Sequence, residues 1–244
     1  MVTQTKNYET GVVRPEPVIT PPTELRVPHL GGTARFVHPS QGPNAYGAVG
    51  KAILEAGQAV PTGDYTASLL AGAYLGTNRD EPEFKNVREL MISRWLWVFN
   101  RNLWIPEGVY SIEDQESLGR SQPLNVNDLE NMLKGGKDFN GIRFSQDGRT
   151  RFAPKGSYKL GEHTPESLAK DGFVVASYGV EGAEKLGEVA GAFKNNPRTF
   201  GLEVAEGQAP ELRVSAVGGV GRLGVFGYSW YGNYDGGLAF GVLK

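Results

Sequence analysis

The chain has 244 residues and carries 27 acidic and 25 basic side chains, for a net charge of −2. This near-neutral charge provides no global field that would attract nucleic acid or an anionic membrane. The absence of cysteine excludes disulfides, thiolate-bound zinc, iron–sulfur clusters and cysteine nucleophiles. No apolar run is long enough to span a membrane, and the first residues lack a signal-peptide pattern. We expect a soluble protein, either cytoplasmic or displayed by an unconventional route.

Proline is concentrated at the N-terminus, where residues 1–48 contain seven of the fifteen prolines. Proline fixes φ and lacks a backbone donor, so a helix or a central strand is disfavoured there. We therefore predict an extended, proline-rich arm over residues 1–48. No linker or internal repeat follows, and residues 49–244 are predicted to form a single domain.

Helical patterns dominate the first part of that domain. Short helices are predicted over residues 49–56 and 65–75, the first closed by Gly57. The acids and proline of Asp80-Glu81-Pro82-Glu83 favour a helix start. Apolar residues then recur at three- and four-residue steps as far as Val98, which predicts an amphipathic helix packed on a core.

The remainder mixes short strands and helices. Extended segments are predicted at 103–106, 109–112, 173–178, 200–204, 212–217 and 238–242, helices at 127–134, from Thr164 to about Gly172 and at 181–194, and a hairpin at 141–154 around Asp147-Gly148. No βαβ period is present, so a doubly wound parallel sheet is disfavoured. The predicted class is α+β, with a helical N-terminal part and irregular short antiparallel strands.

Residues Gly219-Val220-Gly221-Arg222-Leu223-Gly224 match the G-x-G-x-x-G dinucleotide fingerprint. That fingerprint requires a helix opening at the third glycine and a second parallel strand. Only 20 residues remain, and they contain FGYSWYGNYDGGL, which does not form an amphipathic helix. Nucleotide binding is therefore disfavoured, although an enzyme using this loop stays as an alternative.

Other candidate sites are better explained as structure. His29, His38 and His163 lack metal-ligand spacing, so we expect exposed or capping histidines and no metal site. The acids Glu113-Asp114 and Glu116 are expected in a solvated turn. No catalytic residues and no cofactor are predicted.

Aromatic residues cluster where the long predicted helix ends. They are Trp95, Trp97, Phe99 and Trp104. A ligand stack is possible, but core packing is favoured because the helical period already accounts for Trp95 and Val98. The neighbouring arginines are spread along helix faces and are not interleaved with aromatics, which excludes nucleic acid as an expected partner. They are Arg79, Arg88, Arg94 and Arg101.

Residues 217–238 differ from the rest of the chain. Eight of these 22 residues are glycine and five are aromatic, and only Arg222 and Asp235 are charged. Tyrosine, tryptophan, serine, glycine and asparagine are the residues that recognition surfaces use. The alternative is a glycine-rich hairpin whose tyrosines cover the core.

Alternation within this segment predicts a half-buried strand. Leu223, Val225 and Gly227 should point to the core. The opposite face should display Arg222, Gly224, Phe226 and Tyr228. A loop at 231–237 and the closing strand should follow.

The line Arg94–Tyr110, RWLWVFNRNLWIPEGVY, and the ending Ala239-Phe240-Gly241-Val242 after a glycine- and aromatic-rich segment resemble the variable proteins of diversity-generating retroelements, the archaeal branch above all. The resemblance implies a C-type lectin-like fold with a surface-exposed, ligand-binding variable region near the C-terminus. It also implies diversification by reverse transcription that miscopies adenines, often in AAC codons. Residues reachable from AAC occupy all of 217–238 except Trp230, which would then be an invariant scaffold residue.

The resemblance implies a set of ligand-binding, variable positions. They are Gly219, Gly221, Arg222, Gly224, Phe226, Tyr228, Tyr231, Asn233, Tyr234 and Asp235. Related formylglycine-generating enzymes depend on cysteines, which this chain lacks. Ser121-Gln122-Pro123-Leu124 departs from the calcium-ligand motif of the lectins.

We therefore expect a non-enzymatic target-recognition protein with a macromolecular ligand, expected to be a protein, and no membrane insertion. A structural assembly subunit whose proline-rich arm wraps a neighbour is the further alternative.

Overall fold

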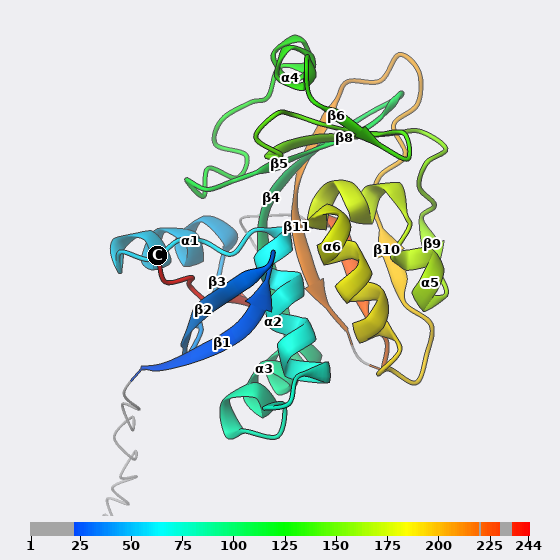
Figure 1. Cartoon of the computed structure of the whole chain (residues 1–244). Coiled ribbons are helices and arrows are strands. Elements are labelled where there is room, and N and C mark those ends of the chain that lie inside the picture. The colour runs from blue at the N-terminus through cyan, green and yellow to red at the C-terminus, as the bar shows by residue number, and fades with distance from the viewer. Residues whose placement is uncertain (1–21, 220, 230–235) are drawn as a thin grey trace, which may run out of the picture.

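The computed structural model describes residues 22–219, 221–229 and 236–244 (Figure 1). Within them the helices are α1 Tyr46–Glu55, α2 Gly63–Leu75, α3 Pro82–Ser93, α4 Val126–Leu133, α5 Pro165–Leu168 and α6 Gly172–Ala190. The strands are β1 Thr23–His29, β2 Gly32–His38, β3 Gln41–Asn44, β4 Trp95–Ile105, β5 Gly108–Glu113, β6 Lys137–Phe139, β7 Ile142–Phe144, β8 Thr150–Pro154, β9 Gly161–Glu162, β10 Arg198–Phe200, β11 Glu211–Gly218, β12 Gly224–Ser229 and β13 Gly237–Ala239.

One large sheet organises the described chain. Its strand order is β6-β7-β8-β5-β4-β11-β12-β10-β9, and β13 pairs with both β4 and β3. Most neighbours are antiparallel, but β10 runs parallel to β12 and β13 runs parallel to β4. β1 and β2 form a separate hairpin. Helices and a largely antiparallel sheet confirm the predicted α+β class.

The centre of the sheet is buried on both faces. On one face, α2 and α6 pack beside each other and join a core that includes Val98, Val217 and Val225 (Figure 1). On the other face, α1 joins a second core with Trp97 and Phe99 of β4. Successive residues of a strand point to opposite faces, so β4 supplies both cores.

The long amphipathic helix predicted through Val98 is wrong beyond Ser93. It ends there as α3, and Trp95–Ile105 is the central strand β4. A strand buried on both faces has a nearly continuous apolar sequence, which also satisfies helical spacing over a few residues. The aromatics of this segment do pack in the core, since Trp97 and Trp104 are at most 1% exposed.

The buried strand predicted at 173–178 is also wrong, because these residues begin α6. The side chain of Asp171 caps the helix by accepting hydrogen bonds from the backbone N–H groups of Phe173 (3.1 Å) and Val174 (3.2 Å). The helix kinks at Gly179, whose φ is +71°. A fully buried helix loses the polar face that would reveal its period.

The predicted solvated turn at Glu113-Asp114 is wrong as well. Asp114 is 2% exposed and accepts hydrogen bonds from the Tyr46 hydroxyl (2.9 Å) and the Gly119 backbone N–H (2.7 Å). Burial raises the pKa of Glu113, although the Arg151 guanidinium lies 3.2 Å away. Partners distant in sequence thus hold both carboxylates inside the fold.

The prediction of an extended arm over residues 1–48 is wrong from residue 22 onward, because these residues form β1, β2, β3 and the start of α1. β1 and β2 pair over their full length, and Leu25, Val27 and Phe36 are at most 2% exposed. Alternating apolar residues bury one face of this hairpin, and its one proline, Pro28, fits because a two-stranded hairpin consists only of edge strands. Residues 1–21 lie outside the described residues.

Several local predictions are confirmed. β7 and β8 form the hairpin around Asp147-Gly148, and Gly148 has the positive φ of +73° that such a turn requires. The helix predicted at 127–134 is present as α4, but its cap is Asn125, which accepts from the Asn127 backbone N–H (2.8 Å), and not Asn127-Asp128. Thr164 and Ser167 form a reciprocal capping box on α5.

Gly227 of β12 packs against the indole of Trp104, whose Nε1–H donates to the Gly227 carbonyl oxygen at 2.8 Å. A Cβ atom added at Gly227 would lie 2.3 Å from Cζ of Phe173 and 2.9 Å from Cζ2 of Trp104. The core therefore accepts only glycine at this point without moving two aromatic rings.

We predict that Gly227→Ala lowers the free energy of unfolding by about 1–3 kcal/mol, because overpacking displaces buried rings. Urea denaturation measures this change. The control is Gly47→Ala in α1, where an added Cβ meets only the Ser117 carbonyl oxygen at 4.0 Å. That variant should be as stable as the parent or more stable. Equal stability of the Gly227→Ala variant and the parent would contradict the close packing beneath β12.

Candidate functional site

Strand β12 shows the predicted alternation. Leu223 and Val225 are 0% exposed and Gly227 is buried, so the inward face is confirmed. On the outward face, the Arg222 side chain is 37% exposed and Phe226 is half-buried. Gly224, expected at the surface, is buried, since a Cβ added there would lie 2.8 Å from the Phe226 ring.

The remaining predicted contact residues fall at the edge of the described chain. The backbone of Tyr228 belongs to β12. Tyr231, Asn233, Tyr234 and Asp235 lie outside the described residues. Their segment leaves β12 after Ser229, whose pairing partner is Val214, and returns at Gly237, whose pairing partners are Trp95 and Asn44. Both ends of the segment are therefore anchored to the central sheet.

Gly219 and Gly221 lie between β11 and β12, and Gly224 is the first residue of β12. Gly219 and Gly221 have φ values of +149° and +73°, and a Cβ at Gly219 would lie 2.1 Å from the Arg222 carbonyl oxygen. An antiparallel strand follows where a dinucleotide site needs a helix. The nucleotide-binding alternative thus loses its structural context. Variability at Gly219 and Gly221 stays a prediction, and this geometry favours glycine at both.

A three-layer stack extends the surface from β12 onto β10. The register pairs Arg198 with Gly224 and Phe200 with Phe226. The two phenyl rings are parallel within 5° at a centroid distance of 4.6 Å, and the Arg198 guanidinium carbon lies 5.3 Å from the Phe200 centroid. We call Arg198, Phe200 and Phe226 the β10–β12 stack. Sequence reasoning placed a strand at 200–204 and missed Arg198, because the pairing of β10 with β12 joins strands that are not consecutive in the chain.

Strand β9 adds an acidic group beside this stack. Glu162 Oε2 lies 3.6 Å from Nη1 of Arg222, and the Glu162 side chain is 60% exposed. Its other oxygen accepts a hydrogen bond from Nδ2 of Asn196 at 3.2 Å. Three segments distant in sequence therefore place two arginines and one carboxylate on a common edge of the sheet.

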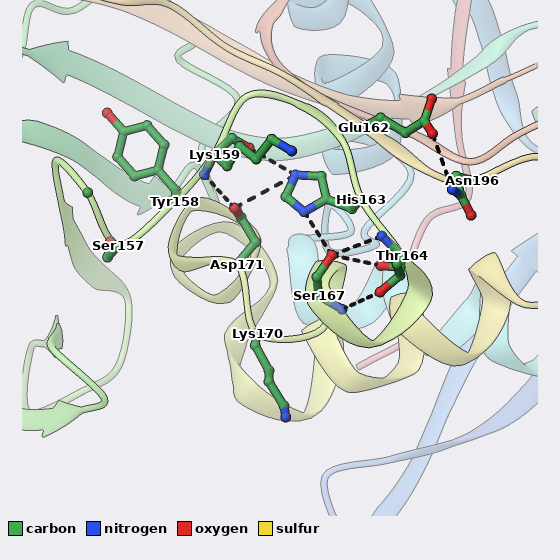
Figure 2. A pocket seen from close by; sticks show the side chains of 11 residues that line it. Ser157, Tyr158, Lys159, Glu162, His163, Thr164, Ser167, Lys170, Asp171 and Asn196 are labelled. Carbon is green, nitrogen blue, oxygen red and sulfur yellow. Dashed lines mark hydrogen bonds and ion pairs between the residues drawn. The ribbon is translucent and has the colours of Figure 1, made fainter.

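A cleft of about 540 Å³ lies next to β9, and His163 is at its centre (Figure 2). His163 is 6% exposed, so its expected exposed or capping placement is wrong. Its Nε2 lies 2.9 Å from the Lys159 carbonyl oxygen and 3.0 Å from Oγ1 of Thr199. The Thr199 hydroxyl also donates to the Lys159 carbonyl oxygen, at 2.8 Å. These contacts tether β10 to the segment that precedes β9.

The other polar groups of the cleft support the same arrangement. Oδ2 of Asp171 lies 3.8 Å from Nε2 of His163, and burial raises the pKa of the Asp171 carboxyl. The Ser167 hydroxyl accepts from the Thr164 backbone N–H (2.9 Å) and lies 3.4 Å from Nδ1 of His163, so it belongs to the cap of α5 (Figure 2). The cluster holds β9 and β10 in place beside β12.

The two other histidines lie against the body. His29 stacks on Tyr65 with a centroid distance of 4.2 Å, and burial lowers its pKa. Nε2 of His38 lies 3.0 Å from Oδ1 of Asn86. Across the described ranges, no three histidine or carboxylate side chains are grouped as metal ligands would be.

Comparison with known proteins gives one structural likeness. The sequence matches no family model and no curated protein. A solved chain from work on how the C-type lectin fold accommodates massive sequence variation in Nanoarchaeota aligns with 82% of this chain and 94% of its own length, at 14% sequence identity and a TM-score of 0.49. Among the helices that the structure describes, none is long and apolar enough to cross a membrane.

We predict that Phe200 and Phe226 stabilise the protein cooperatively. In a double-mutant cycle with Phe200→Ala and Phe226→Ala, the coupling free energy should be about 0.5–1.5 kcal/mol, as for other aromatic pairs. Urea denaturation of the four proteins measures it. Phe139, exposed on the distant strand β6, supplies the control, because Phe139→Ala combined with Phe226→Ala should be additive. Additivity within the Phe200–Phe226 pair would show that the stack contributes nothing beyond burial.

Proposed function

We propose that this chain is a target-binding protein whose segment 217–238 is a variable surface, as in the variable proteins of diversity-generating retroelements. The observation that carries the proposal is that the segment leading into and along β12 has one buried face and one face that is partly exposed. Leu223, Val225 and Gly227 point into the core, while Arg222 and Phe226 lie on the opposite face. The inward residues hold the strand when outward side chains are exchanged, although Phe226 also packs against the second core and its replacement costs some stability.

The framework around this segment favours tolerance to substitution. β11 and β10 flank β12 within one sheet, and the Trp104 indole of β4 donates a hydrogen bond to the β12 backbone at Gly227. A hydrogen bond to a backbone carbonyl does not depend on the outward side chains. The fold is thus specified by positions that alternate with the exposed ones, which is the pattern that a variable surface requires.

The composition of the segment fits recognition better than catalysis. Tyrosine supplies large contact area at low entropic cost, and glycine, serine and asparagine adapt to the partner. In this proposal the ligand contacts come from Arg222, Phe226, Tyr228, Tyr231, Asn233, Tyr234 and Asp235. The aromatic rings act as anchors, and the two charged residues set charge preference. The ligand is a macromolecule, most simply a protein, and the chain carries out no chemical step.

A restricted library tests this proposal. Those seven positions are randomised among residues reachable from AAC by changes in its first two bases, and folding is scored by protease resistance and thermal unfolding. We predict that most members fold, because Leu223, Val225 and Gly227 stay unchanged, and that members lacking an aromatic side chain at 226 are less stable, since Phe226 packs against the second core. A matched library at Leu223, Val225 and Gly227 should mostly fail to fold. If most members of both libraries fail to fold, the seven side chains belong to the core and the proposal is refuted.

The coding DNA offers an independent check. A diversified gene should have, close to a reverse-transcriptase gene, an imperfect copy of its 3′ end that differs only where the copy has adenine. Differences scattered over all four bases would contradict this origin. The tolerance of the surface to substitution would then be judged by the library experiment alone.

A further inference from the structure

Arg198 has an unusual setting for an exposed arginine. It lies on β10, outside the segment 217–238, and its register partner on β12 is Gly224. Its guanidinium carbon lies 5.3 Å from the centroid of Phe200, which stacks in turn on Phe226. A guanidinium that lies over a ring samples fewer orientations than a free one, which reduces the entropy lost when it binds a ligand.

No carboxylate satisfies Arg198 within the part of the chain that the structure describes. Glu162 is its register partner on β9, but that side chain lies 3.6 Å from Arg222 and accepts a hydrogen bond from Asn196. A guanidinium that stacks on a ring keeps its N–H edge available, and this edge matches a carboxylate with two parallel hydrogen bonds.

The surrounding charges favour an acidic side chain over a polyphosphate backbone. Glu162 is 60% exposed beside Arg222 and would repel a phosphate at the next position along the edge. The chain as a whole has a net charge of −2, so it lacks the field that concentrates nucleic acid. One carboxylate placed between aromatic contacts satisfies the site, whereas a row of phosphates does not.

We infer that Arg198 is a fixed carboxylate-binding residue of the ligand surface, and that the partner is a protein presenting an aspartate or glutamate beside an aromatic side chain. The inference rests on the proposed function and deepens it. Arg198 lies outside the variable segment and therefore stays constant while its neighbours on β12 change. Each variant of the surface then keeps one preset contact, and the variable residues select among acidic targets.

The test is a fluorescence anisotropy titration of the full chain at low salt. The probe is a short labelled peptide of alternating glutamate and tyrosine. The comparison probes are the same peptide with lysine in place of glutamate, and labelled oligo-dT. The glutamate peptide should bind more tightly than both. Arg198→Gln should weaken its binding about tenfold or more, as expected for the loss of a charge-assisted bidentate contact.

Arg149→Gln is the matched control, because Arg149 is 57% exposed on the β7–β8 turn and its replacement changes the net charge equally. Its affinity should equal that of the parent, and thermal unfolding should show that both variants are folded. Equal affinity of Arg198→Gln and the parent, absence of glutamate-peptide binding, or tighter binding of oligo-dT would each overturn the inference. These outcomes leave the library result untouched, so the fixed contact can fail while the variable surface stands.

Discussion

Burial of β4 on both faces is the constraint on which the rest of the structure depends. Val98 belongs to the core beneath α2 and α6, whereas Trp97 and Phe99 belong to the core beneath α1. Trp104, further along the same strand, bonds to the β12 backbone at Gly227. The same strand therefore joins two cores and fixes the position of the proposed variable strand. A change that loosens β4 would disturb all three at once.

Support for the binding surface comes from layers behind it. Thr199, between the outward Arg198 and Phe200, is 1% exposed and hydrogen bonds to both His163 and the Lys159 carbonyl. β10 is thus anchored by its inward residue while its outward residues face β12. Buried hydrogen bonds of this kind define one arrangement, because leaving any member unpaired would cost about 1–3 kcal/mol. The geometry of the β10–β12 stack depends on this anchoring of β10.

The sequence predicts the local features of this fold and misses those that depend on distant partners. Asp147-Gly148 and the cap at Thr164 were predictable because their hydrogen bonds close within a few residues. The strand after Ser93 and the helix after Asp171 were misassigned because full burial removes the polar positions that reveal a period. The burial of Asp114 depends on Tyr46, 68 residues away, and no local pattern contains that contact. The β10–β12 stack was missed for the same reason, since it joins two parallel strands that are not consecutive.

A fixed contact beside exchangeable ones addresses a difficulty of any variable binding surface. A randomly changed set of side chains must overcome the loss of translational and rotational freedom before any affinity is measurable. A preset arginine, oriented by Phe200 and unpaired with any described carboxylate, supplies part of that free energy in every variant. Its chemistry also narrows the targets to those with an accessible acid, so variation acts on specificity within a class. Glu162 contributes the opposite selection, because its exposed carboxylate opposes partners with extended negative charge.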